Sequence, residues 1–399
     1  MSGESAKAER QGRFRWLRRR WKVVISVALL ALVAVLVLIT GGIGWYFAGV
    51  LRDDALAPDH APDPLDLEVV AVAAAQITLR PAGAGDDDDW ARDGRYGLQW
   101  EGGYAFVGAI IDRRDGQVVR SFEPIEGGAP EAGERARLDG FVFPGDPLQA
   151  HGLAFDEVAI EGERGPLAAW LVPGERSTWA IFVHGKGADR REGLRVLPAL
   201  AAAGLPVLLI SYRNDEGAPA STDGYYRYGA EEWRDLEAAV QFGLDRGAGD
   251  VVLVGNSMGG SIALAFIDRS PLASRVRGLI LDSPVISFAA TVDSGAKDRG
   301  VPGLVIWAGK RFASRRFGID WDEADYRAEA RALTVPLLLF HGNADERTPV
   351  AESDALAAAR PDIVTYVRVP GARHVRSWNV DPAAYEAAVR DYLGELLEE

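Results

Sequence analysis

The stretch Val251-Val-Leu-Val-Gly-Asn-Ser-Met-Gly-Gly260 decides how the rest of the chain is interpreted. Its apolar start predicts a buried strand, and the residues after Ser257 predict a helix. Gly255 and Gly259 lie two positions from the serine on either side, where bulkier residues would collide in a sharp strand-to-helix turn. Such a nucleophile elbow holds the serine hydroxyl clear of the sheet, next to the Met258 N–H. We predict that Ser257 is a nucleophile, with an ordinary glycine-rich turn as the alternative.

From about residue 154 onward, short apolar stretches alternate with helix-like stretches. This alternation predicts a mostly parallel sheet with helices on both faces. Reactive groups of such a sheet lie on loops at the carboxyl ends of the strands. The expected strands are Phe155–Ile160, Leu167–Val172, Trp179–Val183, Val207–Ser211, Val251–Val254, Gly278–Leu281, Pro336–Phe340 and Thr365–Val369, and the expected helices are 193–203, 230–246, 258–268, 350–360 and 382–398.

A serine nucleophile needs a base, and the chain has five histidines. His374 follows the last expected strand, on a late loop at the carboxyl edge of the sheet, and is the predicted base. His60 lies in a segment rich in proline and aspartate, and His151 lies in a loop before the α/β region. His184 and His341 each end a strand and precede a glycine. We expect His184 to brace its loop.

The base in turn needs a carboxylate that fixes its tautomer and stabilises its charged form. Asp345 lies just past the end of the strand Pro336–Phe340 and is the predicted acid. Asp282, which also ends a strand, is the rival, with capping of the following turn as its other role. The neighbouring Glu346 is expected to face solvent.

Backbone donors are also needed where an oxyanion would form. The stretch Ala180–Gly187 ends a strand in the glycine-containing loop His-Gly-Lys-Gly. We predict that the backbone N–H groups of Lys186 and Met258 form the oxyanion hole.

The composition excludes several classes of site. The chain of 399 residues has no cysteine, so it has no disulfide, no cysteine nucleophile and no cysteine-ligated zinc or iron–sulfur centre. A net charge of −14 argues against broad affinity for nucleic acid. A hydrophobic fraction of 48% is sufficient for a folded core. We expect no metal and no organic cofactor.

The N-terminus combines a basic segment with the most apolar part of the chain. Residues 1–22 hold eight basic and two acidic side chains, and no charged residue occurs between Lys22 and Arg52. A helix over this gap reaches about 43 Å, against a hydrocarbon core of about 30 Å. We predict a basic cytoplasmic segment (1–22) and an uncleaved single-pass anchor in the cell membrane (23–51), with the acidic bulk extracytoplasmic. A cleaved signal peptide and a buried core helix are the alternatives.

Two further regions precede the α/β pattern. Residues 52–66 are rich in proline and aspartate and are expected to form a tether. Residues 67–150 are expected to form a small β-rich accessory region whose aromatic residues build a core. The acidic run Asp86–Asp89 is expected to be a solvated loop rather than a calcium site. The strands expected in this region are Ile77–Arg80, Tyr104–Ile111, Gln117–Phe122 and Arg137–Phe143.

The order Ser257…Asp345…His374 resembles that of the α/β-hydrolase superfamily. The motifs H-G-K-G, G-N-S-M-G-G, H-G-N-A-D and G-A-R-H match that family in position and order, over about residues 154–397. Within it, the chain is similar to bacterial serine hydrolases near the membrane-associated ABHD-type lipases and the prolyl-oligopeptidase-like esterases. The resemblance implies a catalytic domain over 151–399 with an eight-stranded sheet, a Ser-His-Asp triad and hydrolysis of ester, thioester or amide bonds.

The resemblance also implies a cap insertion after the sixth strand, at about 285–333. This insertion is rich in aromatic residues, which suits an apolar acyl chain, and carries interleaved arginine and lysine. The expected function is therefore a membrane-anchored serine hydrolase of small-molecule or lipid acyl esters, working through a covalent acyl-enzyme. The partners expected are that substrate and the membrane, with no nucleic acid. Alternatives are a prolyl-oligopeptidase-like peptidase, an acyltransferase or thioesterase, and a catalytically idle envelope binding protein.

Overall fold

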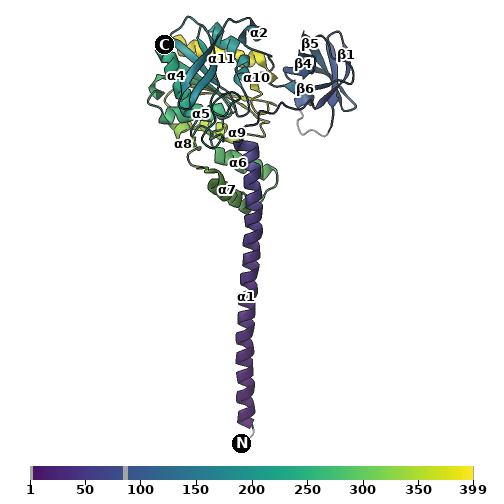
Figure 1. Cartoon of the computed structure of the whole chain (residues 1–399), viewed down its shortest axis with the longest axis vertical. Coiled ribbons are helices and arrows are strands. Elements are labelled where there is room, and N and C mark those ends of the chain that lie inside the picture. The colour runs from purple at the N-terminus through teal and green to yellow at the C-terminus, as the bar shows by residue number, and fades with distance from the viewer. Residues whose placement is uncertain (1–2, 84–88, 399) are drawn as a thin grey trace. The chain divides into compact units, whose positions relative to one another are not determined.

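The computed structural model describes residues 3–83 and 89–398 (Figure 1). The chain divides into two compact units. One combines Met1–Ala55 with Ala296–Ile319, and the other combines Leu56–Gly295 with Asp320–Glu399. The larger unit contains a closed β-barrel and an eight-stranded sheet.

The smaller unit is built on one long helix, α1 (Gly3–Leu51), followed by a π-helical turn, η1 (Arg52–Leu56). The segment Arg18–Leu56 is long and apolar enough to cross a membrane, and its most apolar window has no buried residue. The alternative of a buried core helix is therefore wrong, because none of the described residues covers this apolar window. The expected tether over 52–66 differs at its start, where five residues continue the helix.

The last turns of α1 pack on α7 (Gly303–Phe317), which belongs to the expected cap insertion. A Cβ added to Gly44 would lie only 2.9 Å from the Ala308 Cβ, so the small residue allows the two helices to touch. Trp45 and Phe312 meet edge to face at 6.2 Å, and Arg316 donates a hydrogen bond of 3.0 Å to the Trp45 carbonyl.

The barrel lies in the accessory region and has six antiparallel strands in the order β1-β2-β5-β4-β3-β6. Its interior is filled by side chains that include Tyr96, Trp100 and Phe122, as the aromatic content predicted. The last strand expected from sequence ends earlier than Phe143, because the chain turns after Asp139. The strands are β1 (Leu67–Ala73), β2 (Gln76–Pro81), β3 (Tyr96–Trp100), β4 (Gly103–Arg114), β5 (Gln117–Glu126) and β6 (Arg135–Asp139).

The eight-stranded sheet has the order β14-β13-β12-β11-β9-β10-β8-β7. Only β8 runs antiparallel to its neighbours, β7 and β10, so the mostly parallel sheet predicted from sequence is confirmed. The strands are β7 (Asp156–Gly162), β8 (Gly165–Val172), β9 (Thr178–Val183), β10 (Val207–Ile210), β11 (Asp250–Asn256), β12 (Val276–Asp282), β13 (Leu337–Gly342) and β14 (Val364–Val369).

Helices cover both faces of this sheet. Val252 and Val254 of β11 belong to a buried cluster with residues of α3 and α11, whereas Val251 and Leu253 are buried on the opposite face. The α-helices are α2 (Pro147–His151), α3 (Leu197–Ala202), α4 (Trp233–Asp245), α5 (Met258–Arg269), α6 (Phe288–Asp298), α8 (Arg327–Ala332), α9 (Val350–Ala359), α10 (Ser377–Val380) and α11 (Pro382–Glu398). Short 3₁₀ helices are η2 (Asp89–Ala91), η3 (Arg190–Arg195) and η4 (Ala273–Arg275).

The barrel depends on a buried arginine. Arg120 of β5 is fully buried and donates hydrogen bonds to the carbonyls of Trp90, Arg92, Gly94 and Gly108 at 2.8–3.1 Å. Three of these carbonyls belong to η2 and the residues that join it to β3. The guanidinium therefore holds that segment against the barrel wall.

Replacing Arg120 with methionine keeps the length of the side chain and removes its donors. Because four carbonyls lose a charged donor, we expect unfolding of the full chain to become easier by roughly 3 kcal/mol, as measured by urea titration. Arg114→Met, which removes an exposed arginine from the same barrel, is the control and should cost less than about 0.5 kcal/mol. Equal losses in the two variants would contradict this role.

Candidate active site

Ser257 lies in the turn between β11 and α5 with φ of +50° and ψ of −115°, a conformation that is strained for a side chain larger than glycine. The turn closes because its neighbours are small. A Cβ on Gly259 would lie 2.1 Å from the Val183 carbonyl oxygen, and one on Gly255 would lie 2.7 Å from the backbone of Gly259. The Ser257 N–H donates to the Asp282 carbonyl at 2.9 Å, which ties the turn to β12.

The three side chains predicted to act together form one hydrogen-bonded chain. His374 lies in the loop after β14, with its Nε2 2.8 Å from Ser257 Oγ. Its Nδ1 is 2.8 Å from Asp345 Oδ2, in the loop after β13. The groups come from loops after three parallel strands, because the carboxyl ends of such strands meet at one edge of the sheet.

Asp345 is held as an anion. Its Oδ1 accepts hydrogen bonds of 2.8 Å from the N–H groups of Arg347 and Thr348, and its Oδ2 lies 3.2 Å from Nε2 of the buried His341. Burial alone would raise the pKa of Asp345, but the charge of His374 and these hydrogen bonds hold it well below its usual range. The carboxylate therefore remains ionised beside the imidazole.

Thr348 is a member of this group that the sequence reasoning missed. Its Oγ1 lies 2.6 Å from His374 Nδ1 and 3.0 Å from Asp345 Oδ2. The only signal in the sequence is its position three residues after Asp345, where a short loop returns to the carboxylate.

Asp282, the rival acid, is buried but bonds other groups. Its Oδ1 accepts from the hydroxyls of Ser377 at 2.9 Å and Ser283 at 3.1 Å. Ser283 Oγ in turn accepts from the N–H of Val375, next to His374, at 3.2 Å. Burial raises the pKa of Asp282 to about 6, so its carboxylate binds a proton more readily than that of Asp345. Through Ser283, the Asp282 carboxylate is linked to the backbone of the loop that carries His374.

The predicted oxyanion loop lies against the serine. A Cβ on Gly185 would be 3.2 Å from the Ser257 Cβ, and the Gly185 N–H donates to Glu192 Oε2 at 2.9 Å. Lys186 is the next residue in this loop. Met258 is the first residue of α5, so its N–H has no acceptor within the helix.

The other four histidines have different surroundings. His184 is fully buried, stacks on Tyr212 and pairs with Asp215 at 2.9 Å. Burial would lower its pKa, but the Asp215 carboxylate raises it to about 9. Hydrogen bonds join His341 to the Ser353 hydroxyl and His151 to the Leu194 carbonyl, and His60 is exposed.

Sequence reasoning also missed two buried charges, Glu192 and Arg195 of η3. Glu192 receives the Gly185 N–H, and its Oε1 lies 3.3 Å from Arg195 Nη2. Arg195 Nη1 donates to the Val375 carbonyl at 2.9 Å, beside His374. The pair thus joins the glycine loop to the histidine loop. Since Val375 is 180 residues from Arg195, nothing local in the sequence indicates this contact.

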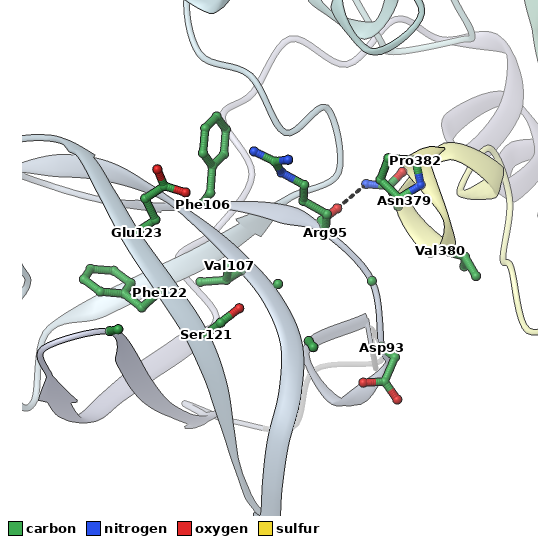
Figure 2. A pocket seen from close by; sticks show the side chains of 14 residues that line it. Asp93, Arg95, Phe106, Val107, Ser121, Phe122, Glu123, Asn379, Val380 and Pro382 are labelled. Atoms are coloured by element: carbon green, nitrogen blue, oxygen red, sulfur yellow. Dashed lines mark hydrogen bonds between the residues drawn. The ribbon is translucent and has the colours of Figure 1, made fainter. Parts of the chain in front are cut away.

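A separate cavity of about 680 Å³ lies between the barrel and the segment Asn379–Pro382 (Figure 2). Phe106 and Phe122 line its barrel side, and Arg95 joins the two sides through a hydrogen bond from Asn379 Nδ2 to its carbonyl at 2.8 Å. Neither Ser257 nor the side chains bonded to it line this cavity.

No cluster of side chains suited to a metal ion occurs among residues 3–83 and 89–398. The acidic run Asp86–Asp89 lies outside the described residues except for Asp89. That residue is buried and pairs with Arg373 and Arg376, so it is not the solvated side chain expected from sequence.

Residues 180–388, more than half of the chain, match the profile of the alpha/beta hydrolase family. The chain belongs to the alpha/beta hydrolase family. Residues 68–139, which cover the barrel, match a domain of unknown function (DUF8805).

Two curated relatives and one solved structure illustrate the likeness. An uncharacterized protein of Mycobacterium tuberculosis, Rv2307c, is 28% identical over 60% of this chain and 79% of its own. The uncharacterized protein YfhR of Escherichia coli K12 is 22% identical over the same shares. The Pyrococcus furiosus esterase Pf2001 superposes with a TM-score of 0.50 at 21% identity, over 64% of this chain and 97% of its own, and so shares the fold.

Amide substitutions distinguish the roles of the two candidate acids. Asp345→Asn leaves His374 without its ionised partner, and we expect the rate at which a fluorophosphonate modifies Ser257 to fall by about 10³–10⁴-fold. Asp282→Asn keeps an oxygen that accepts from Ser377, so its rate should fall by less than about tenfold. A larger loss in Asp282→Asn than in Asp345→Asn would reverse the assignment.

Proposed function

We propose that this protein is a serine hydrolase that cleaves acyl esters. The observation that carries the proposal is the unbroken hydrogen-bond chain from Ser257 Oγ through His374 to the ionised Asp345. A serine hydroxyl is a poor nucleophile unless a base takes its proton, and this geometry supplies one.

The geometry supports the following sequence of steps. The Ser257 Oγ attacks the acyl carbon as its proton moves to His374 Nε2, and the backbone N–H groups of Lys186 and Met258 stabilise the oxyanion. His374 then protonates the leaving alcohol oxygen as its bond to carbon breaks. Water attacks the acyl-enzyme with His374 as base, and release of the acid restores Ser257. Asp345 remains ionised and stabilises the protonated imidazole throughout.

Two observations support an ester, and a lipidic one in particular. The Pyrococcus furiosus relative in fold is described as an esterase. The cap helix α7 packs directly on α1, so a cap element and the candidate membrane helix belong to one compact unit. A substrate dissolved in the membrane suits this construction. The peptidase alternative is disfavoured because a six-stranded barrel is far smaller than a propeller.

A fluorophosphonate probe tests the nucleophile directly. We expect it to label the purified full chain at Ser257 and to leave Ser257→Ala unlabelled, because the activated hydroxyl is the reacting group. Ser270→Ala, which changes the serine at the other end of α5, is the matched control and should label within about twofold of wild type. An unlabelled wild-type chain would sink the enzyme proposal.

The same preparations identify the bond cleaved. A panel of esters graded by acyl length, run beside dipeptide amides, should give turnover of esters only, and added alcohols or amines would reveal transfer to an acceptor other than water. Preferred turnover of the amides would favour the peptidase. A chain that is labelled at Ser257 but turns over none of these compounds would have a reactive serine whose substrate is not in the panel.

We further propose that α1 anchors the protein in the cell membrane with its N-terminus in the cytoplasm. The basic residues before Val23 support this orientation, since positive flanks remain on the cytoplasmic side. Protease added to intact spheroplasts should therefore digest the C-terminal 340 or so residues and spare an N-terminal tag. Protection of the catalytic domain, or its release into the soluble fraction, would contradict the anchor or its direction.

A further inference from the structure

The barrel contacts the loop that carries His374 through one buried carboxylate. Asp89, in η2 at the edge of the barrel, is 6% exposed. Its Oδ1 lies 3.1 Å from Arg373 Nη1, and its Oδ2 lies 3.2 Å from Arg376 Nε. These arginines are the residue immediately before His374 and the second residue after it. One barrel carboxylate therefore fixes the loop on both sides of the histidine.

A second barrel carboxylate contacts the other loop of the site. Asp139, the last residue of β6, is also buried, and its Oδ2 lies 2.5 Å from Arg191 Nη2 and 2.8 Å from the Tyr104 hydroxyl. Arg191 lies in η3, just after the glycine loop that faces Ser257. The barrel thus holds the segments on both sides of the serine.

Arg195 and Asn379 connect these two contacts. Arg195 Nη1 donates to the Asn379 side chain at 2.8 Å and to the Gly140 carbonyl, just after β6, at 3.3 Å. Asn379 Nδ2 donates to the Arg95 carbonyl at 2.8 Å, and the Arg95 N–H donates to the Asn379 carbonyl at 2.8 Å (Figure 2). These two hydrogen bonds join Arg95 of the barrel region to Asn379 of α10.

If these contacts served stability alone, the lost hydration of their buried charges would be a high free-energy cost. Apolar contacts provide adhesion without the loss of hydration that buried charges incur, and a buried ion pair is weak evidence for stability. Its advantage is a defined geometry. Here the buried pairs are made to the two loops on which Ser257 depends, rather than to the body of the sheet.

We propose that the barrel is a positioning clamp, in which Asp89 and Asp139 hold the His374 loop and the glycine loop at the geometry needed for attack by Ser257. This proposal rests on the proposed function and adds a role for the barrel within the same site. Asp89 is a positioning residue, because it acts through Arg373 and Arg376 and does not touch the reacting atoms.

The test compares two carboxylate-to-amide changes in the full-length chain. In Asp89→Asn the loop loses its charged partner on the barrel, although Arg373 keeps its pair with Glu346 at 3.5 Å. A resulting shift of about 1 Å in His374 lowers kcat by about tenfold or more. The KM for the ester of the acyl-length panel that wild type turns over fastest should remain within about twofold, since the acyl-binding surface is untouched. Glu68→Gln breaks an arginine pair with Arg80 elsewhere in the barrel and should change neither constant. A kcat for Asp89→Asn within twofold of wild type overturns the clamp.

A double-mutant cycle separates positioning from general damage. Arg373→Gln, at a side chain 21% exposed, should lower kcat by about threefold or more, and the double variant should fall no further than Asp89→Asn alone. Losses that multiply would show that the two residues act independently and would overturn the proposal. If Asp89→Asn does not fold, Arg373→Gln decides, and an unchanged kcat in it counts against the clamp.

Hydrogen exchange keeps this test distinct from that of the proposed function. If wild type is not labelled by fluorophosphonate, the proposed function fails, but exchange at residues 372–380 still reports on the clamp. Faster exchange there in Asp89→Asn than in Glu68→Gln supports the clamp. Equal exchange in both variants overturns it.

Discussion

The site depends on how closely α5 approaches β9. The Gly259 Cα lies so near the Val183 carbonyl that no Cβ fits between them, and this approach forces Ser257 into a positive φ. The strained turn is held by the Asp282 carbonyl of the neighbouring strand, and the same strand end supplies Ser283 to the histidine loop. Parallel strands that end at one edge are what allow groups so far apart in sequence to meet.

The surroundings of the two candidate acids differ in charge. Asp282 ends β12 and Asp345 lies in the loop just after the neighbouring β13, and both side chains are buried. Asp345 receives two backbone N–H groups and contacts two histidines, so it remains an anion. Asp282 receives only hydroxyl groups among the described hydrogen bonds, and its burial is less well compensated. The difference lies in the number and charge of donors around each carboxylate rather than in its place in the chain.

In the larger unit, side chains at the edge of the accessory barrel contact the loops of the candidate site. The barrel is closed by its own hydrogen bonds and filled by its own core, yet acidic residues at its edge lie against loops of the other sheet. In the smaller unit, α7 packs against the last turns of α1.

Periodicity and short motifs in the sequence were enough to predict the eight strands of the sheet and the elbow. They also placed Ser257, Asp345 and His374 in order after three of those strands. Each strand and each motif is a local pattern, formed by residues that are neighbours in the chain. Two barrel strands, β1 and β3, were missed, and in β3 Gly97 interrupts the pattern. The contacts of Asp89, Arg195 and Thr348 were decided only by the tertiary structure. Their partners are distant in sequence or depend on the path of a loop, and a charged residue whose partner is 180 positions away looks, from sequence alone, like any solvated side chain.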